Sequence, residues 1–139
     1  MTVLVTEAGF TPDDWAEGRV LPFDFFWSGQ DLPEEALAVE FPNDRDPADL
    51  MPWLDRLALI RVGFPAMGDG RGFSIARRLR AMGYAGRLRA VGPLVADQFR
   101  AARRVGFDEI ELPDALAERQ PEAQWRAEMR QSYQERLVS

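Results

Sequence analysis

The sequence predicts a single α/β domain whose mostly parallel sheet contains about four strands connected through helices. Its 139 residues lie within the range of one domain and are enough for one sizeable core. From residue 36 onward, short apolar runs alternate with helical patterns, as in βαβ units. A glycine-rich turn at residues 68–74 then joins an apolar strand to a helix. We expect a βα core over residues 36–112, half-barrel-like or doubly wound, with a flanking cap at 1–35 and a helical segment at 113–139.

The N-terminal flank differs from the core in composition. Residues 1–5 have the apolar and β-branched character of a strand. The remainder combines aromatic side chains with turn-forming residues, which favours a cap beside the sheet over a further βα unit. The aromatic residues are Trp15, Phe23, Phe25, Phe26 and Trp27.

The first βα unit begins with an apolar strand at residues 36–41, which Pro42 ends. Asp46 then offers an N-cap, the next residue is a proline suited to the first helical position, and Asp49 adds an acid to the first turn. We expect a helix here, with Pro52 kinking it or delaying its start.

The second unit contains the glycine-rich turn. Residues 57–64 are nearly continuous in apolar character, as expected of a strand covered on both faces, and Arg61 alone interrupts them. After the turn, apolar residues recur at helical spacing, and Gly83 lies where a C-terminal cap is needed. The apolar residues of this helix are Ile75, Leu79 and Met82.

Two more strands are predicted at residues 87–91 and 107–112. Between them, Gly92 and the proline after it open a helix that Gly106 ends. Pro121 can start a further helix in the C-terminal segment. Right-handed crossovers place the turns that precede the core helices at the carboxyl ends of the strands, the edge where parallel α/β domains bind ligands.

The composition excludes several chemistries. The chain has no Cys and no His, and all 17 of its basic residues are Arg. The missing Cys removes thiolate nucleophiles and disulfides, and the missing His removes the usual acid/base group near neutral pH. Because the chain also contains no Lys, catalysis through a lysine Schiff base is excluded as well.

Charge and hydropathy narrow the class of partner. The net charge of -6 disfavours non-specific binding to nucleic acid, and no apolar stretch is long enough to cross a membrane. Without a secretory signal at the N-terminus, we expect a cytoplasmic protein. The acids at 44, 46 and 49 lack calcium-loop spacing, and no flavin, haem or nicotinamide motif is present, so we expect no metal and no cofactor.

The glycine-rich turn is a candidate anion site. Its glycines permit positive φ and close backbone approach, Ser74 can cap the following helix, and Arg71 can add a charged contact to an oxyanion. A structural reading explains the same residues equally well, with Asp69 bonding inside the turn and Arg71 in solvent. The turn residues assigned to this candidate site are Asp69, Gly70, Arg71, Gly72 and Ser74.

Charged residues within predicted strands extend this candidate site. Arg61 and Arg89 lie in separate strands and, with Arg71, could surround an anion. An internal ion-pair network with strand glutamates is the alternative, and we favour it. Asp97 and Gln98 are candidate polar residues at the same edge of the sheet.

Three ordered motifs stand out: Gly68-Asp69-Gly70-Arg71-Gly72-Phe73-Ser74-x-Ala76-Arg77-x-Leu79-Arg80, Gly86-x-Leu88-Arg89-Ala90-Val91-Gly92, and Asp97-Gln98 followed by Gly106-Phe107-Asp108. Together they resemble a bacterial family of unknown function whose members are described as oxidoreductases involved in sulfite reduction. The resemblance covers the C-terminal two thirds of the chain. It implies a role beside assimilatory sulfite reductase, without a catalytic residue to carry over. Family members often have Cys before the Gly-Phe-Asp segment, where this chain has Val105, so a thiol mechanism is not expected.

Three functional hypotheses follow. The first is an accessory protein of sulfur assimilation that binds a small oxyanion, sulfite reductase or another protein of that process. The second is an enzyme for a phosphorylated or carboxylated small molecule, with arginines orienting the substrate and an acid transferring a proton. The third is an adaptor without catalysis. The sequence does not decide whether the protein is an enzyme.

Overall fold

The fold is described from a computed structural model of the whole chain. Predictions for the glycine-rich turn before Gly70, for Asp97 and for the C-terminal helix lie outside the residues that the structure describes. The described residues are 2–6, 9–12, 15, 20–34, 36–64, 70–92, 94 and 98–113.

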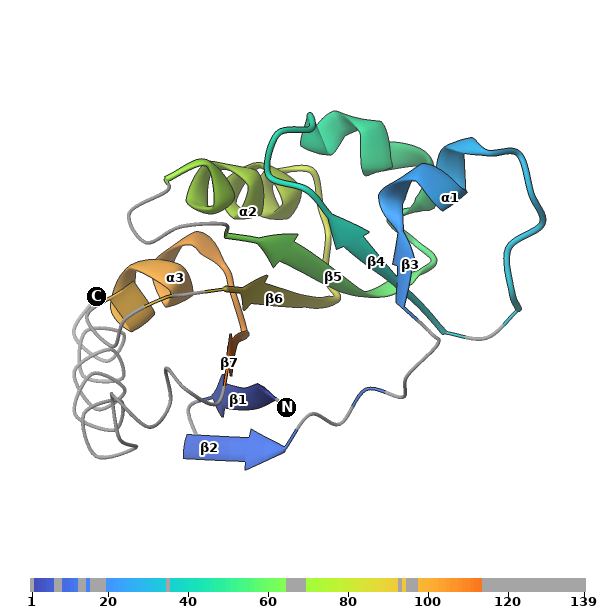
Figure 1. The fold of residues 1–139 in the computed structure, drawn as a ribbon. Helices are drawn as coiled ribbons and strands as arrows, with labels where there is room; N and C mark the ends of the chain where they lie inside the picture. The colour runs from blue at the N-terminus through green and yellow to red at the C-terminus, as the bar shows by residue number, and fades with distance from the viewer. Residues whose placement is uncertain are drawn as a thin grey trace.

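One mixed sheet of seven strands runs through the described part of the chain, in the order β2-β1-β7-β6-β5-β4-β3 (Figure 1). Neighbouring strands from β3 to β7 are parallel, whereas β1 pairs antiparallel with both β7 and β2. The strands are β1 Thr2–Thr6, β2 Gly9–Pro12, β3 Val20–Pro22, β4 Leu37–Phe41, β5 Leu57–Gly63, β6 Arg87–Val91 and β7 Glu109–Pro113. The helices are α1 Phe23–Trp27, the 3-10 helix η1 Pro47–Trp53, α2 Arg71–Ala81 and α3 Phe99–Val105.

The prediction of about four strands was too low. The mostly parallel sheet and the predicted strand at the N-terminus are confirmed, but the flank also supplies β2 and β3. These two strands have four and three residues, too short for a clear alternation of apolar and polar side chains. β3 lies at the sheet edge, where its terminal Pro22 is tolerated because no further strand needs its missing N–H.

The parallel strands follow one another in chain order, which decides between the two predicted architectures. A doubly wound sheet reverses direction at a switch point, whereas β3 to β7 continue in one direction across the sheet. Right-handed crossovers then bring successive helices to the same face. Ile75 and Leu79 of α2 share the buried core with Ile60 and Val62 of β5, on the side where Figure 1 shows α1, η1 and α2.

Local signals at helix ends are mostly confirmed. Asp46 caps η1, because its Oδ1 accepts a hydrogen bond of 2.9 Å from the Ala48 N–H. That bond, with help from Arg78, lowers the pKa of Asp46 below its usual value. Gly83 and Gly106 follow α2 and α3 with φ of 100° and 113°, as C-terminal caps do.

The expected cap at the start of α2 is wrong. The helix begins at Arg71 with Gly70 as its N-cap residue, and that cap has no side-chain hydrogen bond. Ser74 lies three residues further inside, where its own backbone N–H bonds to the Gly70 carbonyl at 3.3 Å. Helical geometry therefore starts one turn earlier than a serine cap required.

Candidate functional site: a charged sheet face and an edge pocket

The sheet face opposite α2 carries a row of charged side chains. Strand register places Arg61 of β5 beside Glu40 of β4 and Arg89 of β6, and Arg89 beside Glu109 of β7. Side chains of register partners project to the same face. We call this surface the charged face, formed by Glu40, Arg61, Arg87, Arg89, Glu109 and Glu111.

Two arginines of the charged face share one glutamate. Arg61 donates to Glu40 at 2.5 Å and to Glu111 at 2.7 Å, and Arg89 donates to Glu111 at 2.8 Å and to Glu109 at 2.7 Å. The side chains of Arg89, Glu109 and Glu111 are 1%, 5% and 5% exposed. The internal ion-pair network that we favoured is therefore present.

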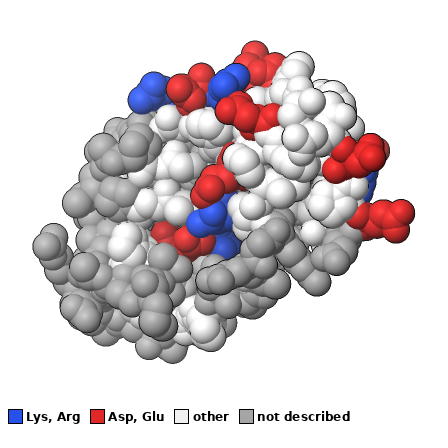
Figure 2. All heavy atoms as spheres, turned by 45° about the vertical axis from the view of Figure 1, so that its right-hand side comes forward, with Lys and Arg blue, Asp and Glu red and all other residues white. Residues whose placement is uncertain are grey.

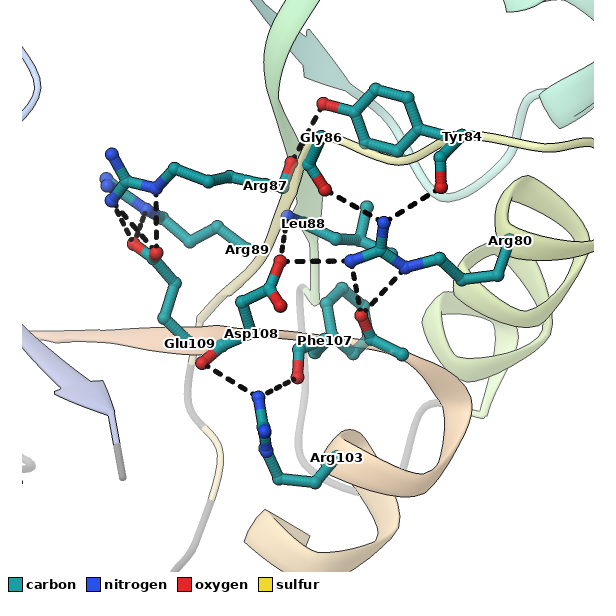
Figure 3. Close-up of polar contacts among 11 residues, drawn as sticks. Arg80, Tyr84, Gly86, Arg87, Leu88, Arg89, Arg103, Phe107, Asp108 and Glu109 are labelled. Atoms are coloured by element: carbon teal, nitrogen blue, oxygen red, sulfur yellow. Dashed lines mark hydrogen bonds and ion pairs between the residues drawn. The ribbon is translucent and has the colours of Figure 1, made fainter. Parts of the chain in front are cut away.

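Arg87 extends the network toward the amino end of β6. It contacts both carboxylate oxygens of Glu109 at 2.9 Å, beside the Arg89 bond to the same group (Figure 3). The network contains three arginines and three glutamates, so its formal charge is zero. Figure 2 likewise shows acidic and basic residues side by side near the middle of one face of the molecule.

The two strand arginines, Arg61 and Arg89, differ in their exposure to solvent. Arg89 is enclosed, so it can support the site without being the first contact for a ligand from solvent. Arg61 has a side chain 16% exposed, and it also lines a pocket at the carboxyl edge. The sequence prediction that brought Arg61 and Arg89 together is matched by their register pairing, and the predicted anion contact stays a prediction.

The described part of the glycine-rich turn has a different arrangement. Gly70, Arg71 and Ser74 are exposed, whereas Gly72 is buried. A Cβ on Gly72 would lie 2.2 Å from the Phe64 ring, so this glycine has a packing role. Asp69 is outside the described residues. Anion binding by this turn remains a prediction.

The polar residues predicted from the next turn are only partly described. Gln98 is half-buried and directly precedes α3, while Asp97 lies outside the described residues. Gln98 does not line either of the two edge cavities described below. Its predicted contact with a ligand is not tested.

Two adjoining cavities open at the carboxyl ends of the parallel strands. They have volumes of about 280 and 360 Å³ and share Pro42, Gly63 and Val91. Their position agrees with the edge expected to bind ligands. A Cβ on Gly63 would meet nothing within 4 Å, so this glycine leaves its wall of the pocket open. We call the first cavity the edge pocket; its lining is Pro22, Phe23, Asp24, Glu40, Phe41, Pro42, Arg45, Arg61, Gly63 and Val91.

Three functional candidates in the edge pocket were not predicted. Arg45 bonds to Asp24 at 3.3 Å, and its guanidinium carbon lies 5.5 Å from the centre of the Phe23 ring. Asp24 follows β3, the strand that sequence patterns missed, and Arg45 lies in the loop after β4. Gly63 was part of a predicted strand, but only the tertiary structure shows that the space beside it is open. Asp24 could not be placed beside Arg45 from the sequence, because that requires the pairing of β3 with β4.

A second cluster fixes the amino-end loops of β6 and β7 (Figure 3). Arg80 Nη1 donates to the carbonyls of Tyr84 and Gly86 at 2.9 and 2.8 Å. Its Nε and Nη2 both reach the Gly106 carbonyl, and Nη2 also contacts Asp108 at 2.9 Å. One planar side chain thus joins α2 to two loops.

Arg80→Lys should destabilise the protein by about 2 kcal/mol, because an ammonium cannot span these divergent acceptors and leaves part-buried carbonyls without a donor. Arg77→Lys is the matched control on the same helix, since Arg77 is exposed, and it should change stability by less than about 0.5 kcal/mol. Urea denaturation measures both. Equal stability of the two variants would contradict the assigned role of Arg80.

Within the described residues, no group of three His, Cys, Asp or Glu side chains is placed to hold a metal ion. No described helix has the length and apolar character needed to cross a membrane.

Comparison with known families gives a match that runs from β4 to the C-terminus. Residues 38–139 match the family described as bacterial protein of unknown function (DUF934). The chain belongs to this family. No curated protein and no solved structure matches the chain significantly.

The family match covers most, but not all, of the residues that line the edge pocket. Glu40, Arg45, Arg61 and Gly63 lie in the matched region, whereas Asp24 precedes it. The family region therefore contains both arginines of the pocket and the glutamate on β4. Pro22, Phe23 and Asp24 form the part of the lining that lies outside the match.

Proposed function

We propose that this protein is an accessory protein of assimilatory sulfite reduction that binds a small oxyanion or carboxylate in the edge pocket. The sulfur setting comes from the sequence resemblance. The observation that supports binding is the placement of Arg61 and Arg45 in an open pocket at the carboxyl edge of the sheet. Arginine suits this role because its planar fork can hold two oxygens of an oxyanion or carboxylate.

Arg61 is already oriented for such a contact. Glu111, 5% exposed, holds one end of its guanidinium, while Glu40, 58% exposed, holds the other. A ligand can displace the exposed Glu40 at small cost, because ion pairs in contact with solvent contribute little. The buried bond to Glu111 would keep Arg61 in position during the exchange.

Gly63→Val tests this placement because it fills the pocket without removing a charge. The backbone at Gly63 has no positive φ and its Cβ direction is open, so stability should change by less than about 1 kcal/mol. Binding of sulfite, sulfate or acetate should weaken at least tenfold, measured by calorimetry. Gly63→Ala is the smaller control and should weaken binding less. Unchanged affinity in Gly63→Val would place the ligand elsewhere.

The sulfur role has its own test in cells. Deleting the gene should impair growth on sulfate or sulfite, and cysteine or sulfide should restore it. A direct partnership should also appear as co-purification with sulfite reductase. Normal growth of the deletion strain on sulfate and sulfite would count against the assignment, whatever the ligand of the pocket.

One observation favours an enzyme as the second candidate. Glu40 is a strand carboxylate at the mouth of the edge pocket, directly beside Arg61. It could exchange a proton with a carboxylated or phosphorylated substrate that Arg61 orients. Turnover lost in Glu40→Gln with substrate binding retained would support this function over binding alone.

The adaptor hypothesis has a separate basis in the structure. Trp27 at the end of α1 is 59% exposed, and its ring lies 5.9 Å from that of Trp53. Trp27→Ser would weaken reductase binding if this aromatic surface made the contact. Retained co-purification in that variant would exclude this surface.

A further inference from the structure

Both arginines of the edge pocket have an acidic partner that also lines the pocket. Arg61 bonds to Glu40 at 2.5 Å, and Arg45 bonds to Asp24 at 3.3 Å. The four side chains sum to zero formal charge, and three of them are about half exposed or more: Asp24, Glu40 and Arg45. The pocket therefore offers accessible groups of both signs.

We infer that the ligand of the edge pocket is a small zwitterion, an α-amino acid with an apolar side chain. The inference rests on the proposed function, because it assumes that this pocket binds a carboxylate. It adds that the same ligand carries an ammonium group and an apolar body.

The charge balance of the pocket is the first argument. An anion without a cationic group that takes Arg61 from Glu40 leaves that glutamate unpaired beside a second negative charge, which opposes binding. An amino acid inserts its carboxylate at the arginine and its ammonium at the displaced glutamate. Every charge then keeps a partner of opposite sign.

The pocket wall supplies the second argument. Phe23, Phe41 and Val91 line the edge pocket together with two prolines, and the absent side chain at Gly63 leaves space beside them. Small-molecule sites typically combine such apolar walls with a few polar groups that orient the ligand. An apolar side chain fits this lining, whereas sulfate or sulfite would leave it unused.

Three related probes separate the parts of the ligand. L-leucine carries both charges, 4-methylpentanoate lacks the ammonium, and 3-methylbutylamine lacks the carboxylate. L-methionine tests a second apolar side chain. Binding to the full chain is measured by thermal shift and calorimetry, with sulfite and sulfate alongside. At about 100 times its Kd, leucine or methionine should raise Tm by roughly 5–10 °C, while each singly charged analogue should bind at least tenfold more weakly.

Glu40→Gln tests the ammonium contact. Affinity for the amino acid should fall about tenfold, whereas affinity for 4-methylpentanoate should stay unchanged or rise because a nearby negative charge is gone. Glu34→Gln is the matched control, since it removes the same charge at an exposed position outside the pocket lining. Equal amino-acid affinity in Glu40→Gln and wild type would overturn the inference.

The outcomes also separate this inference from the proposed function. If 4-methylpentanoate, sulfite or sulfate binds as tightly as leucine and methionine, the zwitterion inference fails and anion binding stands. If neither the amino acids nor the anions bind, both fail. Tight binding of 3-methylbutylamine alone would also overturn both, because the pocket would then recognise a cation.

Discussion

Replacing Arg89 with methionine should destabilise the protein by about 3–5 kcal/mol, because it removes the shared cation from two buried carboxylates. Arg89 is 1% exposed and lies between Glu109 and Glu111, each 5% exposed at its side chain. Methionine approximates the volume of the aliphatic stem, so the loss would come mainly from the buried negative charge that Arg61 and Arg87 then balance only in part. For a domain of this size, the melting temperature should fall by roughly 10 °C.

Two variants show whether charge or packing causes this loss. Arg87→Met removes a partner of the same Glu109 from a position 34% exposed, and solvent should limit its effect to about 1 kcal/mol. Combining Arg89→Met with Glu111→Gln returns the network to zero formal charge, with Arg61 still paired with Glu40 and Arg87 with Glu109, and should recover a large part of the lost stability. A double variant no more stable than Arg89→Met would contradict the charge explanation.

The sequence predicted those strands whose apolar pattern is decided locally. β6 occurs at residues 87–91, as expected, because the apolar residues Leu88 and Ala90 occupy its core positions between clear breakers. β3 was missed since Val20, Leu21 and Pro22 form too short a run, and its place depends on pairing with β4. Antiparallel addition of β1 and β2 beside β7 likewise depends on contacts distant in sequence.

The same limit applies to the candidate site. A charged residue inside an apolar strand singled out Arg61, and the need to pair buried charge predicted glutamate partners. The sequence could not show whether Arg61 contacts a ligand or Glu40, because the pairing with Glu40 depends on the parallel register of β4 and β5. Asp24 and Arg45 carried no local signal, since one lies in the first turn of a short helix, the other lies in a loop, and they meet only through the fold.

The carboxyl edge also depends on a glycine, Gly92, that lets two backbone segments approach closely. Gly92 follows β6 with φ of 142°, and a Cβ there would lie 2.1 Å from the Phe64 carbonyl oxygen. Around it, the Phe64 N–H bonds to the Val91 carbonyl at 2.7 Å, and the Gly92 N–H bonds to the Glu111 carbonyl at 3.3 Å. The ends of β5, β6 and β7 are therefore joined at one point, directly beside the pocket residue Val91.

Gly92→Ala should cost about 3 kcal/mol or more, because the methyl group meets backbone and the required φ is unfavourable for alanine. Gly63→Ala, at the end of the neighbouring strand, is the matched control, since its added Cβ meets open space and its φ is not positive. Denaturant unfolding should separate the two variants by several kcal/mol. Gly92→Ala should also weaken ligand binding at the edge pocket, because relief of the clash separates the strand ends that carry Val91 and Gly63. Wild-type stability of Gly92→Ala would mean that this close backbone approach does not hold the carboxyl edge together.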